Sequence, residues 1–100
     1  MRAMVLDHTG DVSHSPLHLR DRSVPVPQAG QVLVKIHVCG VCRTDLHVVE
    51  GELPNRSFPL IPGHQAVGTV TQAGGGVTGI HEGDRVGIAW LQGTCGQCEF

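Results

Sequence analysis

Apolar and polar residues alternate most regularly between Gln31 and Val38. One face of this segment is β-branched throughout and the other is mixed; the two sets are Val32, Val34, Ile36 and Val38, against Leu33, Lys35 and His37. A period of two residues is typical of a strand with one buried face. The pattern therefore predicts a strand here, with the four β-branched side chains in the core.

Shorter apolar segments, each bounded by turn-forming residues, predict four further strands. They span Met1 to Asp7, Leu17 to Val24, Gln65 to Ala73 and Arg85 to Leu91. Glycine, proline and aspartate punctuate the chain between them, as expected at turns. None of these strands alternates with a long helical pattern, which argues against an α/β architecture.

One segment, Arg43 to Glu50, contains neither proline nor glycine and is followed by Gly51. It predicts about two turns of helix, with Thr44 or Asp45 as the cap at its start. The three prolines between Leu53 and Pro62 predict an irregular loop. The fold class is therefore mainly β with one short helix, and an antiparallel barrel or a sandwich fits the strands equally well.

Composition and charge narrow the range of functions. The chain has 100 residues, which is enough for one small domain, and its net charge is −2 without any run of Lys or Arg. Nucleic acid is therefore not an expected partner. No segment approaches the roughly 18 apolar residues that span a bilayer, and the N-terminus does not resemble a signal peptide. We expect a cytoplasmic protein, in which four cysteines are more often metal ligands or thiols than disulfides.

Two cysteine pairs have the spacing that allows both thiolates to bind one metal ion. Cys95 and Cys98 predict half of a four-ligand zinc site; a redox pair and two ordinary small residues are the alternatives. Cys39 and Cys42 form the second pair, but the 52 residues between Cys42 and Cys95 far exceed the roughly 15–20 of a zinc ribbon. We therefore interpret Cys39 as a small buried residue at a strand end.

Cys42 lies in richer chemical surroundings than Cys39. Asp45 and His47 follow it closely, and His64 comes after Pro62 and Gly63. A thiolate, imidazoles and a carboxylate are the components of a catalytic zinc site, which has three protein ligands, an open position and a carboxylate that orients a histidine.

Four segments, taken together and in this order, resemble the medium-chain zinc-dependent alcohol dehydrogenases. They are Gly40-Val41-Cys42-Arg43-Thr44-Asp45-Leu46-His47, Pro62-Gly63-His64, Gly83-Asp84-Arg85-Val86 and Cys95-Gly96-Gln97-Cys98. The resemblance covers nearly the whole chain. It implies that residues 1–100 form an incomplete GroES-like β-barrel, the N-terminal zinc-binding catalytic domain. The family's Rossmann domain is absent from this chain, so we expect these residues alone to be inactive.

By the same resemblance, Cys42 and His64 would bind the catalytic zinc, and Asp45 would accept a hydrogen bond from the ring of His64. A third ligand, a later cysteine in the family, has no counterpart here. Cys95 and Cys98 would begin the structural zinc site. The expected activity is oxidation of an alcohol to an aldehyde or ketone by hydride transfer to NAD or NADP.

Three residues of the predicted helix would serve the cofactor and the proton. Thr44 would receive the alcohol proton, and His47 would pass it towards solvent, with the cofactor ribose lying between these two residues. Arg43 would face the cofactor pyrophosphate. One departure is Gln65, where many family members carry glutamate. The substitution removes a charge close to the metal but no required ligand.

Other signals are weaker. Gly74 to Gly79 matches the GxGxxG pattern, but no helix is predicted after it, so we interpret it as a turn between strands. The remaining histidines are scattered, and Trp90 is predicted to be core or a cleft wall. A free-standing zinc-binding module and a GroES-like interaction module without catalysis remain the alternatives. The expected partners are a small alcohol or aldehyde and, at full length, further copies of the protein.

Overall fold

A computed structural model describes residues 1–53 and 57–90. Five strands, one α-helix and one 3-10 helix appear in these residues, and the strands and the α-helix lie where the sequence pattern places them. In chain order they are β1 (Arg2–Leu6), η1 (Val12–His14), β2 (Leu17–Asp21), β3 (Val32–Cys39), α1 (Arg43–Glu50), β4 (Ala66–Ala73) and β5 (Arg85–Ile88).

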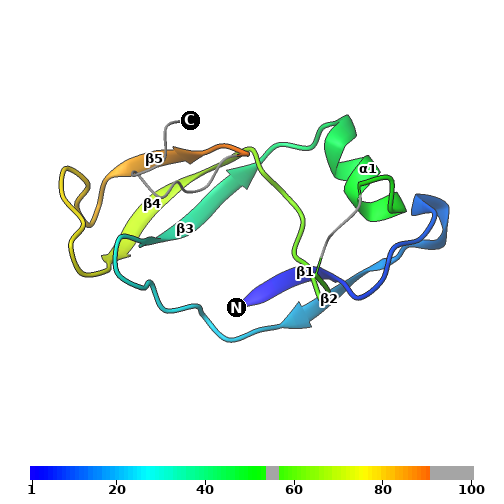
Figure 1. The fold of residues 1–100 in the computed structure, drawn as a ribbon, viewed down its shortest axis with the longest axis horizontal. Coiled ribbons are helices and arrows are strands. Elements are labelled where there is room, and N and C mark those ends of the chain that lie inside the picture. The colour runs from blue at the N-terminus through cyan, green and yellow to red at the C-terminus, as the bar shows by residue number, and fades with distance from the viewer. Residues whose placement is uncertain (54–56, 91–100) are drawn as a thin grey trace, which may run out of the picture.

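The strands form two antiparallel sheets (Figure 1). β1 pairs with β2, and β4 lies between β3 and β5. The segment between α1 and β4 runs back past β1, where Leu6 and Leu60 exchange backbone hydrogen bonds of 2.7 and 2.9 Å. This bridge links the small sheet to the chain that enters β4. The mainly β fold class with one short helix is confirmed, as an antiparallel arrangement of two sheets.

The buried hydrophobic side chains are each at most 7% exposed; they are Val5 and Leu6 of β1, Val48 and Val49 of α1, and Val70 of β4. The turn after β1 is tied to the helix, because Gly10 N–H donates to Val49 O at 3.0 Å. No helix in the described part of the chain is long and apolar enough to cross a membrane.

The 3-10 helix η1 was not predicted from the sequence. Asp11 caps it by accepting hydrogen bonds from the backbone and the hydroxyl of Ser13, at 2.9 and 2.6 Å. These bonds, the hydroxyl bond first, lower the pKa of the Asp11 carboxyl from its usual value.

The predicted core face of β3 is not buried: Val32 and Val34 are half-buried, Ile36 is 48% exposed and Val38 is 60% exposed. The pairing with β4 shifts register between the last two residues, so that Ile36 lies opposite Gly68 and Val38 lies opposite Val67. Cross-strand partners share a face and consecutive residues do not. The β-bulge therefore turns Ile36 and Val38 to opposite faces, which the sequence alternation alone could not reveal.

The glycine-rich segment after β4 is a turn, as predicted, because β4 and β5 are antiparallel neighbours. Gly74 must be glycine for steric reasons: a Cβ there would lie 1.9 Å from the carbonyl oxygen of Gln28. No helix begins between Gly74 and Gly83, so this turn offers no helix N-terminus to a dinucleotide.

Gly68 provides a test of how closely β3 and β4 pack. A Cβ at Gly68 would lie 2.3 Å from Lys35 O and 2.6 Å from Val34 Cγ1, whereas a Cβ at Gly87 in the neighbouring strand meets no atom within 4 Å. We expect Gly68→Ala to lower the free energy of unfolding by about 1–3 kcal/mol through overpacking. The matched variant Gly87→Ala should leave it unchanged or raise it slightly. Urea titration followed by circular dichroism measures both, and equal stability of the two variants would contradict the close approach.

Candidate metal centre

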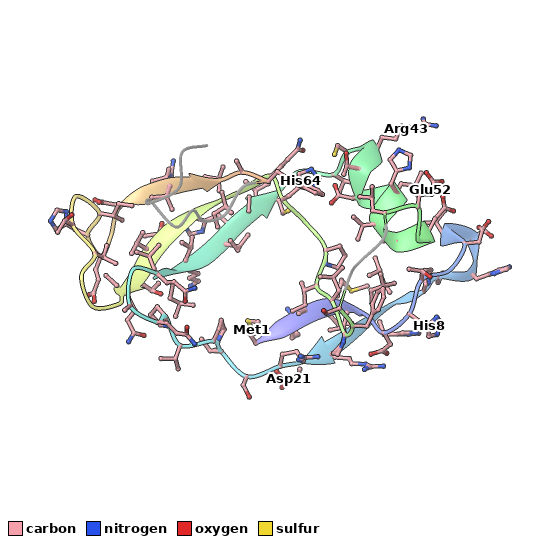
Figure 2. The ribbon with its side chains drawn as sticks, viewed as in Figure 1. Met1, His8, Asp21, Arg43, Glu52 and His64 are labelled. Atoms are coloured by element: carbon pink, nitrogen blue, oxygen red, sulfur yellow. The ribbon has the colours of Figure 1, made fainter. Side chains whose placement is uncertain are left out.

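The end of the β3–β4 ladder determines which residues meet at the candidate site. Cys39 is the last residue of β3 and pairs with Ala66, the first residue of β4. One step further, Gly40 N–H donates to Gln65 O at 2.9 Å. Beyond this bond the two segments of the chain separate: the segment after β3 leads to α1, and the segment before β4 contains His64. Residues just beyond the ladder on these two segments are therefore neighbours in space (Figure 2).

Cys42 is the N-cap of α1, and its backbone is extended with φ −130° and ψ −179°. Asp45, in the first turn, accepts a hydrogen bond from the backbone N–H of Cys42 at 2.8 Å through Oδ2. A carboxylate at this position also interacts favourably with the N-terminal end of the helix dipole. Thr44 and Asp45 were predicted as caps. The N-cap is instead Cys42, two residues before Thr44 and three before Asp45, and Asp45 stabilises this cap from the first turn of the helix.

Cys42, Asp45 and His64 converge, with one potential ligand atom from each lying within 4.8 Å of the others. His64 Nε2 lies 3.2 Å from Cys42 Sγ, and His64 Nδ1 lies 3.2 Å from Asp45 Oδ1. The side chains of His64 and Asp45 are only 14% and 12% exposed. Asp45 Oδ1 is buried and has no hydrogen-bond partner of good geometry. It lies at ion-pair distance from His64 Nδ1, so this carboxylate oxygen faces the ring nitrogen opposite Nε2.

This donor set fits a zinc ion. Zinc binds thiolates at about 2.3 Å and imidazole nitrogens at about 2.0–2.1 Å, so two ligands at a tetrahedral angle lie about 3.5 Å apart. The 3.2 Å between Cys42 Sγ and His64 Nε2 is close to that separation. Asp45 lies at the opposite nitrogen of the ring, where a carboxylate holds a metal-binding histidine with its proton on Nδ1.

Trp90 and the chain before His64 complete the surroundings. The rings of Trp90 and His64 meet edge to face, with centroids 4.9 Å apart and an interplanar angle of 78°. Gly63 has a φ of +126°, which favours glycine. Beside them lies a cavity of about 370 Å³, lined by Asp45, Val48, Leu60, Ile61, Pro62, Gly63, His64 and Trp90.

Trp90 follows β5 rather than lying in a strand, and it is 49% exposed. The prediction that Trp90 is buried in the core is therefore wrong. The alternative prediction, that Trp90 forms part of a cleft wall, is confirmed because it lines the cavity beside His64.

The three residues predicted to serve the proton and the cofactor all lie on α1. Arg43 is exposed at the first helical position and points away from the body of the molecule (Figure 2). Thr44 and His47 are half-buried and, being three residues apart, share one side of the helix. The sequence did not indicate that the ring of His47 contacts the carboxylate of Glu52 through Nδ1. The signal that could have suggested the contact between His47 and Glu52 is that Gly51 ends the helix and an acidic residue follows it directly.

The remaining site predictions have different outcomes. Cys95 and Cys98 lie outside the described residues. Cys39 ends a strand as predicted, but it is exposed rather than buried, because the strand end lies at the surface. Gln65 is exposed, and its backbone carbonyl forms the last bond of the ladder.

The sequence profile of the alcohol dehydrogenase GroES-like domain matches residues 28–100. The chain therefore belongs to the GroES-like N-terminal domain of the medium-chain alcohol dehydrogenases.

Individual relatives agree with this assignment. An alcohol dehydrogenase of Moraxella sp. (strain TAE123) is 48% identical over 98% of this chain, which spans 28% of that protein's length. The cobalt- and zinc-bound thermostable alcohol dehydrogenase of Pyrobaculum aerophilum superposes with a TM-score of 0.84 at 34% identity, over 99% of this chain and 29% of that one. A mycobacterial structure complexed with NADPH gives a TM-score of 0.81 at 34% identity, over 89% of this chain and 27% of that one.

The position of Asp45 behind His64 predicts the effect of its neutralisation. An amide at this position can turn its N–H groups towards Nδ1 and oppose the ring orientation that leaves Nε2 free, so we expect Asp45→Asn to weaken zinc binding by roughly 10- to 100-fold. The measurement is chelator competition in a Cys95→Ser/Cys98→Ser background, which removes the other thiolate pair. Asp21→Asn is the matched control, because the Asp21 side chain is 89% exposed and its partner within residues 1–53 and 57–90 is the N-terminus. Equal zinc affinity of the two variants would contradict the role of Asp45.

Proposed function

We propose that this chain supplies the catalytic zinc site of an enzyme that oxidises alcohols to aldehydes or ketones with NAD or NADP. The observation that carries the proposal is the 3.2 Å approach of Cys42 Sγ and His64 Nε2, with a buried carboxylate at the other ring nitrogen. Relatives of the same family include a zinc-bound alcohol dehydrogenase. The chain spans only about a quarter to a third of such proteins, so the activity is proposed for the whole enzyme.

Cys42 and His64 would hold the metal, and Asp45 would fix the ring of His64. Asp45 can do so because its two oxygens act in different directions: Oδ2 binds the backbone of Cys42 and Oδ1 faces Nδ1 of His64. One carboxylate thus orients both ligands. Zinc, when bound, supplies Lewis-acid chemistry that lowers the pKa of an alcohol hydroxyl towards neutrality.

Thr44 and His47 would carry the alcohol proton away. Their positions on one side of α1, two and five residues after Cys42, support a path in which the Thr44 hydroxyl would take the proton and the His47 ring would release it to solvent. The cofactor, when bound, would supply a ribose hydroxyl between them. Arg43, exposed at the helix N-terminus, offers a guanidinium that can bind the cofactor pyrophosphate in a bidentate manner. Hydride transfer itself belongs to the nicotinamide.

The cavity beside His64 suggests the kind of alcohol. Its wall combines the two polar side chains of Asp45 and His64 with mainly aliphatic ones and the ring of Trp90. Such a lining favours a small alcohol with an apolar substituent, with Trp90 limiting its size. The relative bound to NADPH supports a nicotinamide cofactor.

Alcohol-dependent reduction of NAD or NADP by the intact enzyme tests the proposal. We expect Cys42→Ser and His64→Ala to lower kcat/KM at least about 100-fold, because each leaves the metal with an incomplete set of ligands. Cys39→Ser is the matched control: the same substitution three residues earlier, at an exposed thiol, should leave activity unchanged.

Zinc content is quantified in parallel for each variant. Full activity of Cys42→Ser or His64→Ala would contradict the proposed ligands, and an intact wild-type enzyme that reduces neither cofactor with any alcohol would contradict the proposed function.

A further inference from the structure

The C-terminal end of α1 folds back on itself at Gly51. Gly51 has a φ of +83°, and the next residue, Glu52, donates its backbone N–H to His47 O at 2.9 Å. A glycine in the left-handed conformation followed by a bond of this kind is the usual C-terminal helix cap. The cap returns Glu52 to the last turn of the helix, next to His47.

Two constraints fix this turn independently of the Glu52 side chain. The positive φ of Gly51 disfavours any other residue, and a Cβ at Gly51 would lie 3.0 Å from both Cβ and Oγ1 of Thr9. The neighbouring bond from Gly10 N–H to Val49 O, at 3.0 Å, holds the Thr9 turn against the helix. The backbone therefore places Glu52 beside His47 before any side-chain contact forms.

The side chains then meet, with Glu52 Oε2 in hydrogen-bond contact with His47 Nδ1. An ionised carboxylate can only accept, so the proton of this bond belongs to Nδ1, and Nε2 of the neutral ring keeps a free lone pair. The other acidic residue at this helix end, Glu50, is directed elsewhere: its Oε2 accepts from Val12 N–H at 3.2 Å.

We propose that Glu52 is a positioning residue, which holds His47 in the Nδ1–H tautomer so that Nε2 can accept the proton released in alcohol oxidation. The inference rests on the proposed function, in which His47 passes that proton to solvent. Nε2 takes the proton from the hydroxyl next in the path, the Nδ1–H bond to Glu52 stays in place, and the imidazolium then gives the Nε2 proton to water. Glu52 stabilises the transient charge and is itself unchanged.

A purely structural role for the pair is the competing explanation. The side chains of His47 and Glu52 are 35% and 56% exposed, and an ion pair this exposed adds little to stability. Glu52→Ala should therefore leave the thermal midpoint almost unchanged, since the backbone cap does not use the side chain.

The tautomer of His47 tests the inference without any enzyme assay. In long-range proton–nitrogen NMR spectra of the ¹⁵N-labelled chain, at a pH where the ring is neutral, wild type should show Nδ1 protonated. Glu52→Ala should lose this preference, Glu52→Gln should retain part of it through the amide oxygen, and the matched control Glu50→Ala should resemble wild type. A wild-type ring protonated on Nε2, or a Glu52→Ala spectrum identical to wild type, would overturn the proposal.

Kinetics of the intact enzyme separate this inference from the proposed function. We expect Glu52→Ala to lower kcat about tenfold, within the range of general acid–base effects, with the KM for alcohol within about twofold of wild type. Glu50→Ala should keep wild-type kinetics. An active wild type with an equally active Glu52→Ala variant overturns the role of Glu52 alone, whereas a wild type without alcohol-dependent activity overturns the proposed function and the relay with it.

Discussion

The register between β3 and β4 determines where the chemistry of this domain can occur. Cys42 and His64 are 22 residues apart in sequence, and no local structure brings them together. They meet because the ladder ends at Cys39 and Ala66 and one further bond joins Gly40 to Gln65. A slip by one residue would turn each paired side chain to the other face and move His64 away from α1. The close packing at Gly68 resists such a slip.

The strands and the α-helix could be predicted from the sequence because particular residue types mark where each element ends. Glycine and proline mark the strand ends, and Arg43–Glu50 is helical as predicted because nothing in it interrupts a helix and Gly51 stops it. The bulge between Ile36 and Val38 has no such marker, so the predicted core face of β3 was wrong. Cys42, Asp45 and His64 were identifiable from residue type and resemblance, whereas the contact of His47 with Glu52 depends on a backbone turn that only the structure reveals.

α1 is short, yet it organises most of the candidate site. At its N-terminal end, Asp45 connects the backbone of Cys42 to the ring of His64. At its C-terminal end, Glu52 contacts the ring of His47. Each histidine thus has a carboxylate at Nδ1, which leaves Nε2 available, in one case for a metal ion and in the other for a proton. The helix holds both pairs in a fixed relation because it is anchored to the core through Val48 and Val49.

X-ray absorption at the zinc edge tests most directly whether Cys42 and His64 share a metal ion. The sample is the zinc-loaded chain with Cys95→Ser and Cys98→Ser, so that the described thiols alone can contribute sulfur. We expect one sulfur at about 2.3 Å with nitrogen or oxygen ligands at about 2.0–2.1 Å. The sulfur should disappear with Cys42→Ser and persist with Cys39→Ser. A sulfur that survives Cys42→Ser, or a zinc shell without sulfur in the parent chain, would contradict a zinc site at Cys42 and His64.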